Sequence, residues 1–116
     1  MLEARQAAET DFAKTLLSVL DHFEMALSVD PAHVDAKNIL DGVKITYDEL
    51  IKILQKRGIE SFDPAGEPFD PFRHEAISIE KTDQMPPQTV MQTLQRGYRF
   101  GDRVLRSAKV KVSAAP

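Results

Sequence analysis

Apolar residues in the first quarter of the chain recur at alternating spacings of four and three. This spacing places them on one face of a helix, with a seam like that of a heptad repeat. It predicts a helix over residues 3–29, which should end at Asp30-Pro31 because the residue before proline avoids helical geometry. The positions that set the pattern are Phe12, Leu16, Val19, Phe23 and either Ala26 or Leu27.

A second helix is predicted over residues 36–57. Asp35 is its expected N-cap, and Gly58, which follows two basic residues, is its expected C-terminal stop. Its apolar positions are Leu40, Val43, Tyr47, Leu50 and Leu54. The two segments together form a helical hairpin.

The apolar faces of both predicted helices are broad at about 100° per residue. Two helices that pack only on each other cannot bury faces this wide. A second copy of the hairpin would cover them, so the sequence predicts a homodimer with a four-helix bundle. The residues expected in the dimer core are Phe12, Leu16, Val19, Leu20, Phe23, Leu27, Leu40, Val43, Tyr47, Leu50 and Leu54.

After residue 58 the hydrophobic period changes to two, which predicts strands with one buried and one wet face. Residues 76–79 form a short run of this kind. Gly101-Asp102 should close a tight hairpin, preceded by a strand over residues 89–100 in which Gly97 marks a bulge or a close approach. The longest alternation places Val104, Ala108, Val110 and Val112 on one face and Arg103, Ser107, Lys109 and Lys111 on the other.

Helices followed by strands predict an α+β fold with segregated parts. We expect residues 1–58 to form a helical dimerisation region. Residues 59–116 should form a small, mostly antiparallel β domain.

The composition fits a small globular protein. The 116 residues suffice for one ordinary domain or two very small ones, and no apolar run approaches the ~18 residues of a membrane helix. The N-terminus lacks the order of a secretory signal, and the absence of cysteine removes disulfides and thiolate chemistry. A cytoplasmic location without membrane contact is therefore expected.

The net charge of −3 argues against a generic nucleic-acid binder, which usually carries a basic excess. In the second half the charges are segregated. Residues 60–83 hold seven acids and two bases, whereas residues 96–111 hold six bases and one acid. Either acidic and basic strands pair across one small sheet, or a basic edge docks on an acidic protein surface.

The segment F-D-P-A-G-E-P-F-D-P-F-R-H-E-A, residues 62–76, gathers residue types that metal or acid–base sites use. Asp70, His74 and Glu75 would supply the chemistry, but a zinc site needs three or four converging donors and the H-E-x-x-H spacing is absent. A structural interpretation is favoured: each Asp-Pro pair sets a turn, and His74 fixes a turn or strand entry. No metal or cofactor is expected, with a small metal-dependent enzyme as the alternative.

No serine elbow, P-loop or dinucleotide-binding glycine pattern occurs, so hydrolase and nucleotide-binding functions have no support. Gly42 lies inside the second predicted helix, where glycine costs about 1 kcal/mol relative to alanine. It indicates either close helix packing or room for a partner. Arg103 and Arg106, beside the predicted hairpin, are either interface anchors or part of a solvated sheet face.

Three stretches form a more specific pattern. They read L-L-S-V-L-D-H-F-E-M-A-L, then D-P-F-R-H-E-A, and then T-V-M-Q-T-L-Q-R-G-Y-R-F-G-D-R-V-L-R-S-A-K-V-K-V. The last two resemble the C-terminal signature of the GrpE family, the nucleotide exchange factors of DnaK-type chaperones, and the first is similar to the end of that family's long helix. The resemblance spans roughly residues 16–112.

The resemblance implies a homodimeric co-chaperone that is not an enzyme. Its β domain would bind the nucleotide-binding domain of the chaperone and open the cleft, so that ADP leaves and ATP enters. A generic dimeric adaptor for another partner remains the alternative. By similarity, the chaperone contacts would come from Phe69, Pro71, Leu94, Arg103 and Val112 in the β domain and from Gly42 and Val29 in the helices.

The chain also departs from the family pattern. Met25 stands where the family often has arginine, so the resemblance does not imply a charged contact from this helix. Ser107 stands where proline is frequent. The family's long upstream helix has almost no counterpart here, so we expect a truncated or unusually short form and carry over no thermosensing.

Overall fold

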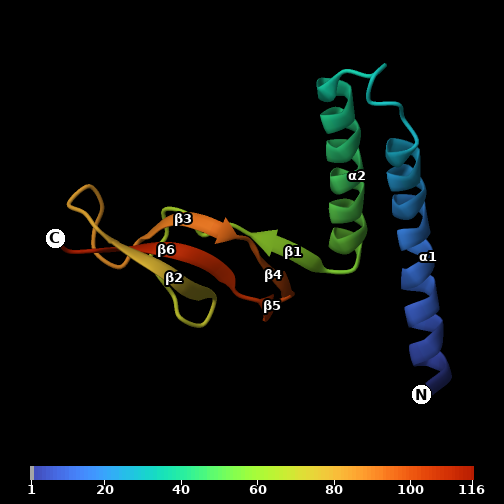
Figure 1. Ribbon diagram of the computed structural model, residues 1–116. Helices are drawn as coiled ribbons and strands as arrows, with labels where there is room; N and C mark the ends of the chain where they lie inside the picture. Colours follow the sequence, from blue (N-terminus) through green and yellow to red (C-terminus); the bar gives the residue numbers. More distant parts are fainter. Residues whose placement is uncertain (1) are drawn as a thin grey trace. The chain divides into compact units, whose positions relative to one another are not determined.

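The computed structural model describes residues 2–116, which fold into two compact units (Figure 1). The first, called the helical unit below, ends at Arg57. The second, called the β unit, runs from Gly58 to Pro116. The fold is α+β, as the sequence predicted.

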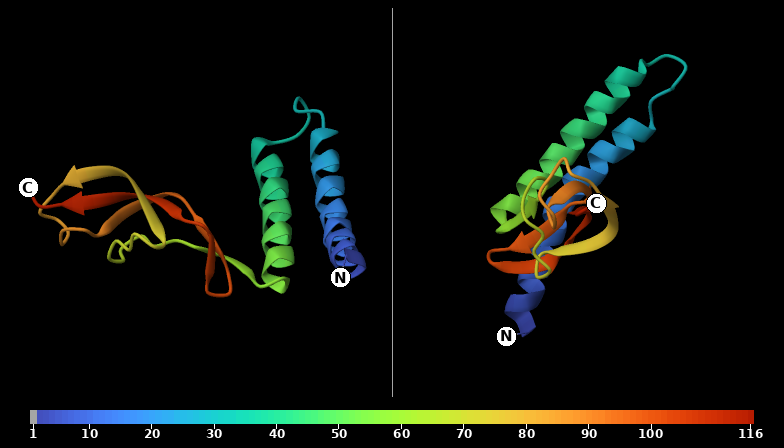
Figure 2. Two further views of the ribbon diagram at one scale, coloured as in Figure 1. Left: turned by 90° about the horizontal axis from the view of Figure 1, so that it is seen from below. Right: turned by 90° about the vertical axis from the view of Figure 1, so that its left-hand side faces the viewer.

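The helical unit is a hairpin of α1 (Leu2–Leu27) and α2 (Ala36–Lys56), which lie side by side in both views of Figure 2. Both predicted helices are confirmed to within two residues at each end. Asp35 occupies the N-cap with extended backbone, but its carboxylate makes no capping hydrogen bond. Gly58 follows the C-cap in the left-handed conformation, with a φ of 82°, and stops the helix as predicted. Within residues 2–116, neither helix combines the length and apolar character needed to cross a membrane.

Polar contacts connect the two helices. The Ser18 hydroxyl donates a hydrogen bond of 2.8 Å to Glu49, and His22 Nδ1 pairs with the other oxygen of the same carboxylate. The Ser18 hydrogen bond lowers the pKa of Glu49, and His22 lowers it further. Nearer the open end, Arg57 pairs with Asp11 at 3.1 Å.

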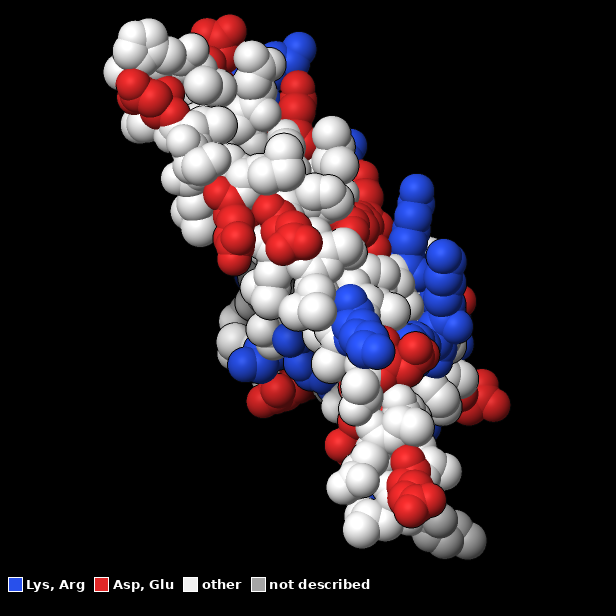
Figure 3. All heavy atoms as spheres, turned by 90° about the vertical axis from the view of Figure 1, so that its right-hand side faces the viewer, with Lys and Arg blue, Asp and Glu red and all other residues white. Residues whose placement is uncertain are grey.

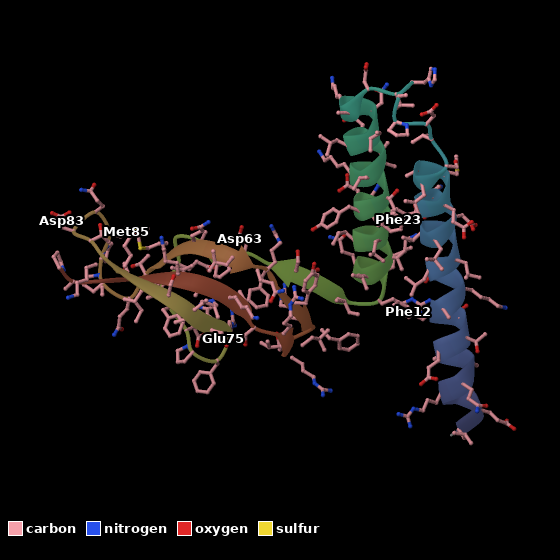
Figure 4. All side chains as sticks on the ribbon, in the orientation of Figure 1. Phe12, Phe23, Asp63, Glu75, Asp83 and Met85 are labelled. Carbon is pink, nitrogen blue, oxygen red and sulfur yellow. The ribbon has the colours of Figure 1, made fainter. Side chains whose placement is uncertain are left out.

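Much of the apolar surface of the hairpin is open to solvent. Val19 is buried, and Phe12, which lies with Phe23 on the side of α1 toward α2 (Figure 4), is half-buried. Leu16, Leu50 and Leu54 are also half-buried. Six of the eleven residues predicted for the dimer core are exposed in the single chain, namely Leu20, Phe23, Leu27, Leu40, Val43 and Tyr47. The dimer itself stays a prediction.

The first sheet of the β unit consists of β1 (Ile59–Phe62), β4 (Gly97–Phe100) and β5 (Arg103–Arg106), in the order β1-β4-β5. Both strand pairs are antiparallel. The turn between β4 and β5 is Gly101-Asp102, which confirms the predicted hairpin. Gly101 has a φ of 57°, a conformation that glycine adopts without steric cost.

The second sheet consists of β2 (His74–Lys81), β6 (Ala108–Ala114) and β3 (Val90–Gln95), in the order β2-β6-β3. β3 runs antiparallel to β6, whereas β2 runs parallel to it. Among the pairs formed within residues 2–116, three of four are therefore antiparallel. The mostly antiparallel arrangement is confirmed.

The predicted extents of two strands are wrong, and so is the prediction that the strands form one small sheet. The strand expected over 89–100 is interrupted at Arg96, and β3 and β4 belong to different sheets. The alternation through Val112 is likewise interrupted at Ser107, between β5 and β6. An extended chain keeps its period of two when it passes from one sheet to another, so alternation alone does not reveal the change of partner.

The core of the β unit is small and lies in the second sheet. Val90, Ala108 and Val110 have no exposed surface, and Val112 is buried beside them. Phe62 and Phe69 pack against this cluster. The two Phe-Asp-Pro triplets therefore each contribute one aromatic ring to the core.

Candidate partner-binding site

The turn before β2 is organised around His74. The Asp70 amide donates to His74 Nδ1 at 2.9 Å, and the Phe72 amide donates to the Asp70 carboxylate at 3.0 Å. His74 is 7% exposed, and its burial lowers its pKa, so the neutral ring acts as acceptor. Glu75 is exposed at the neighbouring position. In the part of the chain that the structure describes, no three His, Asp or Glu side chains converge as a metal site would require.

The first Asp-Pro turn is tied to β3 through Asp63 (Figure 4). Its carboxylate accepts a 2.5 Å hydrogen bond from the Thr93 hydroxyl and one of 3.1 Å from the Ala65 amide. The Thr93 bond is the main cause of the lowered pKa of Asp63. In both Asp-Pro pairs of residues 62–76 the carboxylate accepts a bond from the amide two residues on, which supports the predicted turns.

Three of the residues singled out by the family resemblance meet at one groove of the β unit. Phe69, Pro71 and Val112 all line it, and its volume is about 530 Å³. The lining carries no charged side chain, so the groove suits an apolar group of a partner. The remaining lining residues are Ala76, Ile79, Pro87, Gln88, Ser113, Ala114 and Ala115.

Leu94 and Arg103 lie on other strands, outside this groove. Leu94 is half-exposed on β3, and Arg103 is exposed at the start of β5. The ion pairs found within residues 2–116 do not include Arg103. The groove and these two side chains are therefore separate features of the β unit.

Other charges pair across strands, which supports the first of the two explanations for the segregated charge. Arg99 on β4 pairs with Glu60 on β1 at 2.6 Å, and Lys111 on β6 pairs with Glu80 on β2 at 3.2 Å. The pairing occurs in two sheets rather than in one. On the face shown in Figure 3, charged side chains of both signs are interspersed with uncharged surface.

Val29 and Gly42 line a second groove, of about 310 Å³, in the helical unit. Met25 lines it too. A Cβ atom added at Gly42 would meet no atom within 4 Å. Close helix packing inside the hairpin therefore does not explain this glycine, and the alternative, room for a partner, remains.

Sequence reasoning missed several residues of the groove in the β unit. Ser113 is buried although it directly follows the buried Val112, so alternation predicts it on the opposite face. Gln88 adopts a φ of 59°, and no glycine or asparagine marks that position. Neither residue gives a pattern that could have revealed it.

The comparison with known families covers both units of the chain. The family model for GrpE matches residues 2–114, which include every helix and strand described above. The chain belongs to the GrpE family.

Curated relatives named Protein GrpE support this membership. The protein from Geobacillus kaustophilus (strain HTA426) is 42% identical over 113 residues, and the protein from Thioalkalivibrio sulfidiphilus (strain HL-EbGR7) is 42% identical over the same length. The GrpE protein of Aquifex aeolicus (strain VF5) is 41% identical over 114 residues. These alignments include 97% to 98% of this chain but only 53%, 60% and 63% of the respective relatives.

Proposed function

We propose that this protein is a co-chaperone that acts as a nucleotide exchange factor, not as an enzyme. In this proposal a homodimer in the cytoplasm binds the nucleotide-binding domain of a DnaK-type chaperone, opens its cleft and accelerates ADP release. The observation that supports this most strongly is the family match over residues 2–114.

Nucleotide exchange needs no catalytic side chain. A protein that binds the open cleft more tightly than the closed one shifts the population toward the open form. Each ~1.4 kcal/mol of that preference weakens nucleotide binding about tenfold once the open form dominates. The binding surface must therefore keep its shape, and a buried core and hydrogen-bonded turns give the β unit this property.

The proposed contact surface combines apolar and cationic groups. The groove would accept an apolar side chain of the chaperone, and Arg103 would face an acidic one. The helical groove, which Val29 and Gly42 line, would form a further contact. The proposed contact residues are Phe69, Pro71, Leu94, Arg103 and Val112 in the β unit and Val29 and Gly42 in the helical unit.

The homodimer in this proposal rests on the open apolar faces of the hairpin. Leu20, Phe23 and Leu27 on α1 are exposed, as are Leu40 and Val43 on α2. Apolar surface of this extent on one small unit is typical of an interface. A second hairpin packed on these faces would remove it from water.

Stopped-flow kinetics tests the exchange activity. A DnaK-type chaperone loaded with a fluorescent ADP analogue is mixed with excess ATP, with and without this protein. We expect faster release when the protein is present in substoichiometric amounts. Binding without acceleration would favour the adaptor function. Stoichiometric metal in the purified protein, together with an enzymatic activity lost in a folded His74→Ala variant, would favour the enzyme.

A further inference from the structure

Ser113 connects β6 to the loop that precedes β3. Its side chain is 1% exposed. The hydroxyl donates to the carbonyl of Pro86 at 2.6 Å and accepts from the amide of Thr89 at 2.9 Å. The backbone adds two bonds, from the Ser113 amide to the Thr89 carbonyl and from the Gln88 amide to the Ser113 carbonyl, each of 2.9 Å. One buried serine therefore holds residues 86–89 at four points.

Gln88 is the strained member of this loop. Its φ of 59° lies in the left-handed region, which a residue with a Cβ atom adopts at a cost. Such a conformation persists only where the surroundings hold it. Here its amide is bound to Ser113, and its carbonyl accepts the amide of Phe69 at 2.8 Å. The strained residue thus lies between Ser113 and Phe69.

Phe69 in turn shapes the groove. The Val90 amide at the start of β3 donates a 2.9 Å hydrogen bond to the carbonyl of Glu67, two residues before Phe69. The loop of residues 86–89 and the turn that carries Phe69 are therefore hydrogen-bonded at more than one point. Pro87 and Gln88 line one part of the groove, and Phe69 and Pro71 line another. A displacement of the loop would therefore alter the groove on both of these sides.

We propose that Ser113 is a positioning residue for partner binding. Its hydroxyl fixes the loop, the loop holds Gln88 in the left-handed conformation, and the Gln88 carbonyl fixes the amide of Phe69. Ser113 also lines the groove, but it is 1% exposed and its hydroxyl is engaged by Pro86 and Thr89, so it acts through these groups rather than through a hydrogen bond of its own to the chaperone. The inference rests on the proposed function, because it assigns the role of keeping the groove in the shape that binds the chaperone.

The experiment uses the full chain and two readouts. The first is amide hydrogen exchange by NMR in the free protein, at Phe69 and Thr89, with Val110 as reference. The second is affinity for a DnaK-type chaperone. Ser113→Ala should speed exchange at Phe69 and Thr89 about tenfold relative to Val110, and weaken binding by a similar factor. Ser61→Ala on β1, in the other sheet, is the matched control and should change neither.

If Ser113→Ala does not fold, two substitutions at Gln88 in the exposed loop test the same series of contacts. Valine is β-branched and disfavours the left-handed region, whereas glycine adopts it freely. Gln88→Val should therefore speed exchange at Phe69, and Gln88→Gly should do so much less. Equal exchange rates in the two variants would overturn the role of the strained residue.

The two readouts separate this inference from the proposed function. Unchanged exchange at Phe69 in Ser113→Ala would overturn the positioning role. Faster exchange with wild-type affinity would overturn its importance for binding. If the wild type itself does not bind the chaperone, both the proposed function and the role of Ser113 in binding fail. Amide hydrogen exchange in the free protein would still decide whether Ser113 fixes the position of Phe69.

Discussion

The ring of Phe62 occupies the space that a side chain at Gly97 would need. A Cβ atom built at Gly97 would lie 2.2 Å from Cζ of Phe62, far inside contact distance. The two residues are direct partners across β1 and β4, and Phe62 also packs against the buried core of the other sheet. An aromatic ring that covers a strand glycine in this way fixes the register of the two strands. The close approach expected at Gly97 is thereby confirmed.

Gly97→Ala should therefore destabilise the β unit. The added methyl group forces the ring or the strand to move, and overpacking of this kind costs about 1–3 kcal/mol. Urea unfolding followed by NMR of β-unit amides would measure the change. The double variant with Phe62→Leu is the control, since the methyl group should cost much less once the ring is gone. An equal cost in both backgrounds would show that the ring is not the cause.

Gly42→Ala, in contrast to Gly97→Ala, should stabilise the protein. Gly42 is inside α2, its added Cβ would meet nothing within 4 Å, and alanine is favoured over glycine in a helix by about 1 kcal/mol. Thermal unfolding followed by far-UV circular dichroism should show a higher midpoint. A lower midpoint would indicate that another copy of the chain packs closely at this position.

The helices could be predicted from sequence because their signals are local. The spacing of Phe12, Leu16 and Val19 and the stop at Gly58 each depend on a few neighbouring residues. The strands were predicted as extended segments, but the sheet changes at Arg96 and Ser107 were not. Which strand pairs with which depends on contacts distant in sequence, and alternation does not encode them.

The candidate site was predictable only in part. Asp63 and Asp70 were recognised as turn formers because the Asp-Pro pair acts locally. Phe69 and Pro71 were singled out by family resemblance, not by any hydrophobic pattern. Ser113 was not predicted, because the contacts that bury its hydroxyl come from a loop 24 to 27 residues earlier in the chain.

The stability of the β unit should fall as the pH drops below about 6.5. Burial lowers the pKa of His74 below its ordinary value of 6.5, so the unfolded chain takes up this proton at a higher pH than the folded one. The contribution of His74 to stability is fully present above its pKa in the unfolded chain. It is lost as the pH falls from that value toward the lower pKa of His74 in the folded protein.

The His74 effect can be isolated with His74→Asn, whose side-chain oxygen can still accept the Asp70 amide but does not titrate. Urea midpoints at pH 7.5 and pH 5 should differ less in this variant than in the wild type. The same pH dependence in both proteins would assign it to other groups.

Arg103→Ala should reduce the acceleration of ADP release without affecting dimer mass. Loss of one exposed charge contact is worth up to about 1 kcal/mol, or roughly fivefold. The loss should shrink at high salt because exposed charges are screened. Lys109→Ala, an exposed cation on β6, is the matched control. An equal loss there would point to general basic charge, and a dissociated or unfolded Arg103→Ala would make this arginine structural.

Leu40 and Ile45 offer a matched test of the predicted dimer. Both lie on α2 and both are 67% exposed in the single chain, but only Leu40 belongs to the predicted dimer core. Light scattering at micromolar concentration should give the wild type twice the chain mass of 13.0 kDa.

Leu40→Asn should weaken that association by about 1.5–3 kcal/mol, since burial of a leucine in an interface is worth this much. Ile45→Asn should weaken it far less, because Ile45 would stay in water in either state. A wild type with the mass of a monomer would contradict the predicted four-helix bundle. Equal weakening by both substitutions would mean that the interface includes a face of α2 that the heptad-like spacing does not identify.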